Sequence, residues 1–157
     1  MTNRTREAEF TEFLGNHGSR LRHAFIARYG PDVGSDVMAD VAEYAWKHWD
    51  KVLAMDSPSG WLYRVGQSRS RKYFRHLRPL RLPAPRSDRL PEVEPALPSL
   101  VASLPESQRV AVLLTQAFGY TEREAAETIG VSPSTVHQNT QRGLERLRAR
   151  LGVPSNA

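Results

Sequence analysis

A basic segment with interleaved aromatic residues has the chemistry to hold single-stranded nucleic acid. Between Ser57 and Ser87 there are eight basic residues and no acidic residue. Phosphates pair with arginine and lysine, and unstacked bases stack on aromatic rings, so such interleaving favours a surface that holds separated strands. The side chains that predict this surface are Tyr63, Arg64, Arg69, Arg71, Lys72, Tyr73, Phe74 and Arg75.

A second group of polar side chains lies on the last predicted helix, over residues 133–151. Its apolar positions are Val136, Thr140, Gly143 or Leu144, Leu147 and Leu151. This pattern leaves a polar set outward, namely Ser134, Thr135, His137, Gln138, Gln141 and Arg142. Arginine pairs with guanine and glutamine with adenine in the major groove, and hydroxyls at a helix start suit phosphate. The alternative is an ordinary solvated helix face in a bundle.

The elements around this polar set read as a helix-turn-helix. Thr121 with Glu124 predicts a capping box at a helix start, and Gly130 predicts the end of that helix. A serine followed by a proline at 132–133 caps the next helix. A helix-turn-helix needs a small residue where its helices touch, a turn residue and an apolar anchor at fixed spacing, and this spacing is met by Ala126, Gly130 and Val136.

The N-terminal half predicts further helices. Three-and-four spacing of apolar residues runs from Phe10 to Tyr29, with Gly15 and Gly18 marking a break. The next helix, capped by Ser35 or Asp32, would bury one face and expose an opposite stripe. The buried face comprises Met38, Ala42, Ala45, Trp49 and Val52, and the stripe comprises Asp36, Asp40, Glu43, Lys47 and Asp50. A turn at 56–60 leads into the basic segment.

Six prolines between positions 79 and 98 divide the chain. This density excludes a helix and predicts an extended, flexible linker. The expected organisation is a domain over 1–78, the linker 79–98, a domain over 99–152 and a tail over 153–157. Helices are expected at 99–103, 105–118, 121–129 and 133–151. No strand pattern occurs, so the fold class is all-α, with two small helical domains joined by a Pro-rich linker.

Composition excludes several function classes. The net charge is +5, and 19 of the 22 basic residues are arginines, since only positions 47, 51 and 72 are lysine. The absence of cysteine rules out thiolate metal sites and cysteine nucleophiles and fits a reducing compartment. His137 has no histidine or cysteine at ligand spacing, and no catalytic motif occurs. We expect no enzyme activity, no cofactor and no metal, and, without a leader or apolar span, a cytoplasmic location without membrane insertion.

Two stretches of the chain resemble the sigma-70 family, specifically its small extracytoplasmic-function (ECF) type. The stretch SLPESQRVAVLLTQAFGYTEREAAETIGVSPSTVHQNTQRGLERLRARL is similar to region 4, whose pattern includes L-P-x-x-Q-R-x-V. GSDVMADVAEYAWKHWDKV resembles region 2.2, and SPSGWLYRVGQSRSRKYFRHLR resembles regions 2.3 and 2.4, including the W-L-x-R core. Together these matches cover about residues 10–78 and 99–152.

The resemblance implies a DNA-binding specificity subunit of RNA polymerase. Its clamp-helix contacts, on the beta-prime subunit, would be Asp36, Asp40, Glu43 and Lys47. The basic segment, now including Ser68, would recognise and melt the minus-10 element, and the six polar residues of the last helix would read the minus-35 element. The turn 54–59 would take a flipped base, whereas Trp61 would mainly pack. Val110, Leu113 and Leu114 would serve the core and partly meet the beta flap, and an anti-sigma factor is a possible partner.

Three positions depart from the family pattern. Small sigma factors usually carry glutamine at the position of Ala39, asparagine at that of Ser68 and aspartate at that of Lys72. These departures leave the minus-10 preference and part of the clamp contact open. Two alternatives also remain: a stand-alone helix-turn-helix regulator, and a sigma-like adaptor that binds polymerase without opening promoters.

Overall fold

The chain is helical in every element that the structure describes. The computed structural model describes residues 2–74 and 97–154, and this part contains no strand, so the all-α prediction is confirmed. Most of the expected linker lies outside the described residues, as does Arg75. Helix α6 (Leu97–Ala102) begins two positions before the expected boundary.

The first helices form one continuous, bent segment. Helix α1 (Asn3–Phe13) passes through a π-helical stretch, η1 (Leu14–Gly18), directly into α2 (Ser19–Tyr29). The predicted break at the two glycines is therefore wrong. A π-helical turn inserts one extra residue into the helix, which shifts the buried face without ending the helix.

Helix α3 (Pro31–Lys47) crosses α2, and α4 (Trp49–Leu53) follows it after one residue. Helix α5 (Pro58–Ser70) then runs into a 3-10 turn, η2 (Arg71–Phe74). The buried stripe of α3 is Val37, Val41 and Ala45, and it continues through Trp49 and Val52. The predicted stripe was thus one position off at its start, because its spacing was anchored on Met38, which is only half-buried.

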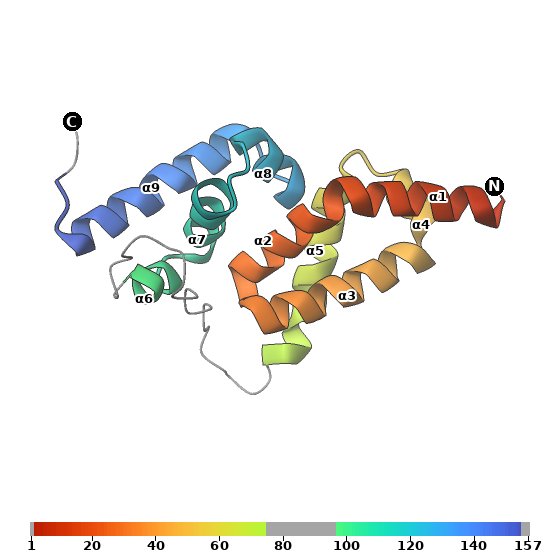
Figure 1. Cartoon of the computed structure of the whole chain (residues 1–157), viewed down its shortest axis with the longest axis horizontal. Helices are drawn as coiled ribbons and strands as arrows, with labels where there is room; N and C mark the ends of the chain where they lie inside the picture. The colour runs from red at the N-terminus through yellow and green to blue at the C-terminus, as the bar shows by residue number, and fades with distance from the viewer. Residues whose placement is uncertain (1, 75–96, 155–157) are drawn as a thin grey trace, which may run out of the picture.

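The C-terminal half consists of α6, α7 (Glu106–Val112), the π-helical η3 (Leu113–Ala117), α8 (Glu122–Ile129) and α9 (Pro133–Leu151). These match the four helical segments expected from sequence to within a few residues. Helix α9 packs on α7 and α8, and the far end of α9 meets α6. Figure 1 shows α9 and α1 at opposite ends of the molecule.

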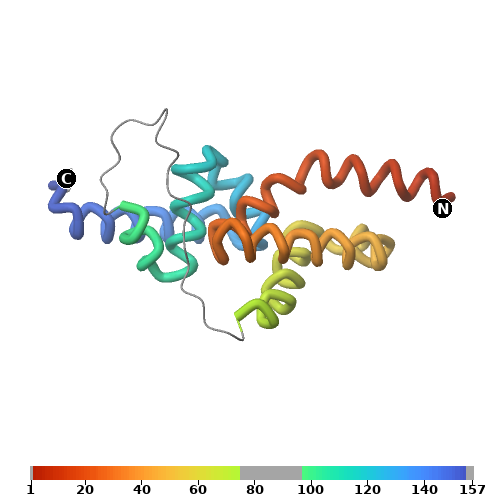
Figure 2. Tube along the Cα trace, turned by 60° about the horizontal axis from the view of Figure 1, so that its bottom comes forward, coloured from red at the N-terminus to blue at the C-terminus, as the bar shows by residue number. Residues whose placement is uncertain are grey.

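The two halves are packed against each other. Helices α2 and α5 contact α8, and α2 also contacts α7 and η3. One buried apolar cluster contains residues of both halves, among them Phe25 and Trp49 from the first and Leu114 and Val136 from the second. Figure 2 shows the same close approach from another side. The described helices therefore share a continuous core, which sequence periodicity alone did not indicate.

Candidate nucleic-acid interface

The predicted helix-turn-helix is present in α8 and α9. Thr121 caps α8 as predicted: its hydroxyl accepts a hydrogen bond from the Glu124 amide, and the Glu124 carboxylate accepts one from the Thr121 amide. Gly130 ends α8 in the left-handed conformation, with φ of 73°. Ser132 caps α9, and Pro133 occupies its first turn. The local sequence therefore fixes both helix ends and the tight turn between them.

All six residues predicted to read the major groove are exposed on α9. They are Ser134, Thr135, His137, Gln138, Gln141 and Arg142. Val136 is fully buried and Thr140 nearly so, which fixes the rotation of the helix about its axis. This rotation turns the polar side chains outward as one face.

His137 has a partner that the sequence pattern did not reveal. Its Nδ1 atom lies 2.8 Å from the Oε1 atom of Glu122, at the start of α8. The two helices of the motif are thus also joined by a polar contact at the exposed face. A carboxylate beside the reading face reduces its positive potential locally, so His137 is a weaker candidate for a phosphate contact than Arg142.

The second predicted surface lies on α5 and η2. Five of its members are exposed, namely Arg64, Ser68, Arg69, Arg71 and Lys72. Tyr73 and Phe74 are half-buried, and the Phe74 ring lies 5.3 Å from that of Tyr29. The structure therefore brings most of the cationic residues to the surface of two consecutive elements, α5 and η2.

Tyr63 is the exception among the described members of this surface. It is 4% exposed, and its ring stacks on that of Phe25, with 5.5 Å between the ring centroids. Its hydroxyl accepts a hydrogen bond from the Arg28 guanidinium, and burial raises the pKa of Tyr63 above its ordinary value. In this arrangement Tyr63 packs the core and offers no face to a base. Helical spacing explains the error, because aromatic side chains in a basic segment can still point inward.

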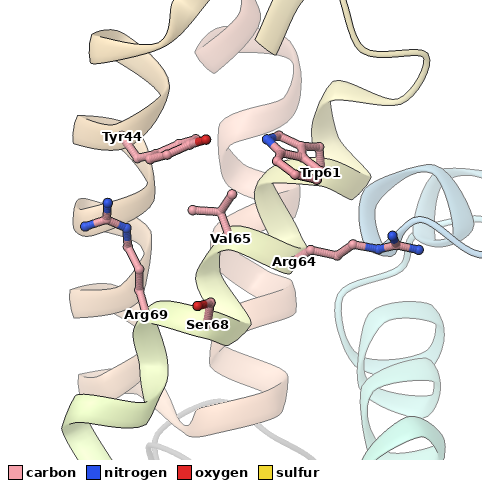
Figure 3. Close-up of a pocket in the computed structure, with 6 residues that line it drawn as sticks. All are labelled: Tyr44, Trp61, Arg64, Val65, Ser68 and Arg69. Carbon is pink, nitrogen blue, oxygen red and sulfur yellow. The ribbon is translucent and has the colours of Figure 1, made fainter. Parts of the chain in front are cut away.

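A hollow of about 330 Å³ opens between α3 and α5. Figure 3 shows Tyr44 and Trp61 facing each other across it, with Val65 between them at its floor and Arg69 and Ser68 below. Arg64 extends from its edge toward the C-terminal half. The Arg69 guanidinium lies 5.3 Å from the centre of the Tyr44 ring.

The hollow adds two aromatic residues that sequence reasoning had not placed at the site. Trp61 was expected mainly to pack; it is half-buried and lines the hollow, and its indole Nε1 atom is buried without a hydrogen-bond partner. Tyr44 comes from α3, and no local pattern links it to α5. Two aromatic walls beside arginines suit a flat, unstacked base.

The predicted polymerase-binding stripe lies on the outer side of α3. Asp36, Glu43 and Lys47 are exposed, whereas Asp40 is half-buried. Lys47 pairs with Glu43 at 2.6 Å, an i,i+4 contact within the helix. Three of the four residues of the stripe are therefore accessible, and Asp40 is partly covered.

Asp40 connects this stripe to the predicted minus-10 surface. Its Oδ2 atom lies 2.8 Å from Lys72 Nζ and accepts a hydrogen bond of 2.7 Å from the Tyr73 hydroxyl. Burial opposes ionisation of Asp40, but hydrogen bonds from Lys72 and Tyr73 outweigh it and hold the pKa of this carboxyl below its ordinary value. The two predicted surfaces are thus adjacent and share a polar contact.

The apolar residues discussed for the flap contact lie mostly inside. Val110 and Leu114 are buried, and Leu113 is half-buried.

Among residues 2–74 and 97–154, no group of histidine, aspartate and glutamate has the arrangement to hold a metal ion. In the same part of the chain, every helix is too short or too polar to cross a membrane.

Comparison with known proteins is consistent with this geometry. Residues 95–147 match the family described as sigma-70, region 4. This part of the chain is therefore similar to region 4 of the sigma-70 family. Over 50 residues, the chain is 44% identical to the ECF RNA polymerase sigma factor ShbA of Streptomyces griseus subsp. griseus. This match covers 32% of the chain and only 26% of that relative, so it spans about a quarter of the relative's length.

Solved structures share the fold of this chain over nearly its whole length. The sigma factor RpoE in complex with the anti-sigma factor NepR, from Bartonella quintana, has a TM-score of 0.63 and 21% identity, covering 94% of this chain and 99% of that one. CnrH in complex with the cytosolic domain of CnrY has a TM-score of 0.57 and 24% identity, covering 95% and 91%. The all-α arrangement is thus that of a known ECF sigma factor fold.

Proposed function

We propose that this chain binds core RNA polymerase and directs promoter-specific transcription initiation, as an ECF sigma factor. The observation that carries the proposal is the pairing of two exposed nucleic-acid faces, one on α5 and η2 and one on α9, in a chain with a region 4 match. The polymerase would carry out the phosphodiester chemistry. Because this chain would act together with the polymerase, we propose that it acts in the cytoplasm.

Each face supports a separate role. The polar residues of α9 would read the minus-35 element in the major groove, with Arg142 and Gln138 as the principal base contacts. The cationic surface of α5 and η2 would follow the backbone of the minus-10 element. The hollow between Tyr44 and Trp61 would hold a base of the separated strand.

The polymerase contact would lie on α3. Asp36, Asp40 and Glu43 would pair with basic residues on the beta-prime clamp helices, and Lys47 would extend the same stripe. Leu113, half-buried, is the best placed of the three apolar residues considered for the beta flap. An anti-sigma partner is proposed because RpoE was solved with one.

A reconstituted transcription reaction tests the proposal. The purified chain is added to core RNA polymerase with genomic DNA fragments, and transcript starts are mapped. New starts that depend on the chain are expected. Stable core binding without new starts would favour the adaptor, and DNA binding without core binding would favour the stand-alone regulator.

A further inference from the structure

We propose that Glu122 is a positioning residue for base recognition: it holds the ring hydrogen of His137 at Nδ1, so that the Nε2 atom meets DNA as an acceptor and selects adenine or cytosine. This inference rests on the proposed function, in which α9 reads the minus-35 element. Glu122 lies at the start of α8 and is not among the residues predicted from sequence to touch DNA.

The contact between the two side chains has one possible direction when the carboxylate is ionised. His137 Nδ1 lies 2.8 Å from Glu122 Oε1, which is hydrogen-bond distance. An ionised carboxylate can only accept hydrogen bonds, whereas each imidazole nitrogen can donate or accept according to the tautomer. The Nδ1 atom must therefore carry the hydrogen. In a neutral ring this leaves a lone pair on Nε2.

Both side chains lie at the surface, where a DNA duplex can reach them. The side chain of His137 is 53% exposed and that of Glu122 is 45% exposed. Among the residues that the structure describes, the Nε2 atom of His137 has no hydrogen-bond partner. The nitrogen whose state Glu122 determines is therefore the one left for a ligand.

His137 lies at one edge of the polar reading face of α9. It is in the second turn of the helix, and the N-terminal part of a recognition helix is the part that contacts base edges. Val136, the residue before it, is fully buried, so His137 points about 100° away from that buried side. Gln141 is exposed one turn farther along the same side. His137 therefore belongs to the reading face and also reaches α8.

The major groove distinguishes bases by the hydrogen-bonding groups that they present. Adenine and cytosine each present an amino group there, whereas guanine presents two acceptors and thymine presents one acceptor and a methyl group. A lone pair on Nε2 accepts from an amino group and is unfavourable against a second acceptor. The other tautomer, with hydrogen on Nε2, would reverse this preference. Glu122 thus controls a base preference without touching the base.

The charge of Glu122 has a second effect, which can be separated from the first. A carboxylate beside the reading face repels DNA phosphates, and this lowers the affinity for every sequence alike. The tautomer of His137 matters only at the base pair that His137 contacts. The ratio of affinities for two duplexes that differ at that base pair therefore cancels the charge effect and reports the tautomer effect.

The test variant is Glu122→Gln, which keeps the size of the side chain. Its amide can donate to Nδ1 as well as accept from it, so both tautomers of His137 find a partner and the choice between them is released. Glu127→Gln is the matched control, because it makes the same change at another exposed glutamate of α8, whose ion-pair partner is Arg20.

Nitrogen-15 NMR of the free chain measures the tautomer without DNA. We expect hydrogen at Nδ1 of His137 in the unmodified chain and in Glu127→Gln, at a pH where the same spectra show a neutral ring. In Glu122→Gln we expect a shift of population towards hydrogen at Nε2. An unchanged tautomer in Glu122→Gln would overturn the proposal, because Glu122 would then not determine it.

DNA binding is measured with the chain bound to core RNA polymerase. The probes are a duplex that this complex selects from a pool randomised over the minus-35 element and the single-base variants of that duplex. At one base pair we expect about a fivefold preference for adenine or cytosine, the value of one ordinary hydrogen bond. This preference should persist in Glu127→Gln and nearly vanish in Glu122→Gln.

A double-mutant comparison shows whether Glu122 acts through His137. His137→Ala identifies the contacted base pair, and in that background Glu122→Gln should leave every base preference unchanged. A preference for guanine or thymine at that base pair would overturn the proposal, as would a changed tautomer with an unchanged preference. Absence of sequence-dependent binding in the unmodified chain and all variants would contradict the proposed function itself, and the NMR result would distinguish that failure from a failure of the Glu122 contact.

Discussion

At the scale of single residues, Lys72 shows how a departure from the family pattern fits this chain. The family's usual aspartate at this position would bring a second carboxylate against Asp40. Lysine instead pairs with Asp40 at 2.8 Å, beside the Tyr73 hydroxyl. Lys72 therefore provides an ion pair at the junction of the two predicted surfaces, where a carboxylate would face Asp40 with like charge.

Replacing Lys72 should raise the pKa of Asp40. In Lys72→Met the carboxyl loses a charged hydrogen-bond donor, so its pKa moves up toward the ordinary value. Because the pKa of Asp40 is lowered in the folded chain, its contribution to stability is present above the ordinary pKa and is lost as pH falls. NMR titration of the Asp40 carboxyl measures the shift. Lys47→Met, which removes the partner of Glu43, is the control and should leave Asp40 unchanged.

Arg142 should carry base specificity in the second half. Arg142→Ala is expected to cost about 1 to 3 kcal/mol of binding and to relax preference at one base pair. Binding to a panel of single-base variants of the minus-35 element measures both effects. Arg148→Ala, at an exposed position farther along α9, should leave preference unchanged. A uniform loss on all sequences would mean that Arg142 contacts phosphate.

His23 should make the contact between the halves sensitive to acid. Burial, together with the charge of Arg22, lowers the pKa of His23. It also faces the Tyr120 hydroxyl, near Arg20 and Glu124. A lowered histidine pKa means that its stabilisation is complete above the ordinary value and is lost as pH falls through the lowered one. NMR titration of the His23 ring should give a midpoint below that of an exposed histidine; an equal or higher midpoint would contradict this.

At the scale of elements, local sequence predicted most of the secondary structure but not its partners. The ends of α8 and α9 were predictable because a cap hydroxyl, a glycine and a proline act within a few residues. The buried stripe of α3 begins at Val37, one position before the Met38 that the sequence predicted, because both residues are apolar and either could start the pattern. The hollow between Tyr44 and Trp61 was missed because it depends on how two helices cross, and single-helix periodicity does not report that.

The capping box should contribute measurably to the helix-turn-helix. Thr121→Ala removes the hydroxyl that accepts from the Glu124 amide, and it is expected to cost about 1 kcal/mol of unfolding free energy. Urea unfolding followed by circular dichroism measures this. Thr11→Ala, at an exposed position inside α1, removes a threonine without removing a cap and serves as the control. Equal effects of the two changes would show that the cap adds nothing.

At the scale of the whole molecule, the shared core and the contact between halves are what the sequence did not reveal. Arg109 stands in a recognisable family pattern, yet its acceptors Ala27 and Arg28 are about 80 residues away and are backbone carbonyls. Backbone acceptors have no signature in the sequence. The pairing of Arg28 with Glu106 could not be predicted either, because many other charged residues are spread along the sequence.

Charge reversal should test that pairing across the whole molecule. Arg28→Glu or Glu106→Arg alone places like charges together, and each should favour separation of the halves. The double reversal should restore the contact, with a coupling energy of about 0.2 to 1 kcal/mol because Glu106 is largely exposed. Energy transfer between dyes on the two halves, at low and high salt, measures it. No recovery in the double variant would show that the pair contributes no specific attraction.

The position of Arg109 also links the shape of the molecule to backbone hydration. When the halves part, the carbonyls of Ala27 and Arg28 lose their donor and must bind water instead. Stabilising osmolytes are excluded from newly exposed protein surface and therefore oppose this step. The arrangement in which the two halves are in contact should consequently gain population in a concentrated osmolyte solution, even where no charge in the chain has changed.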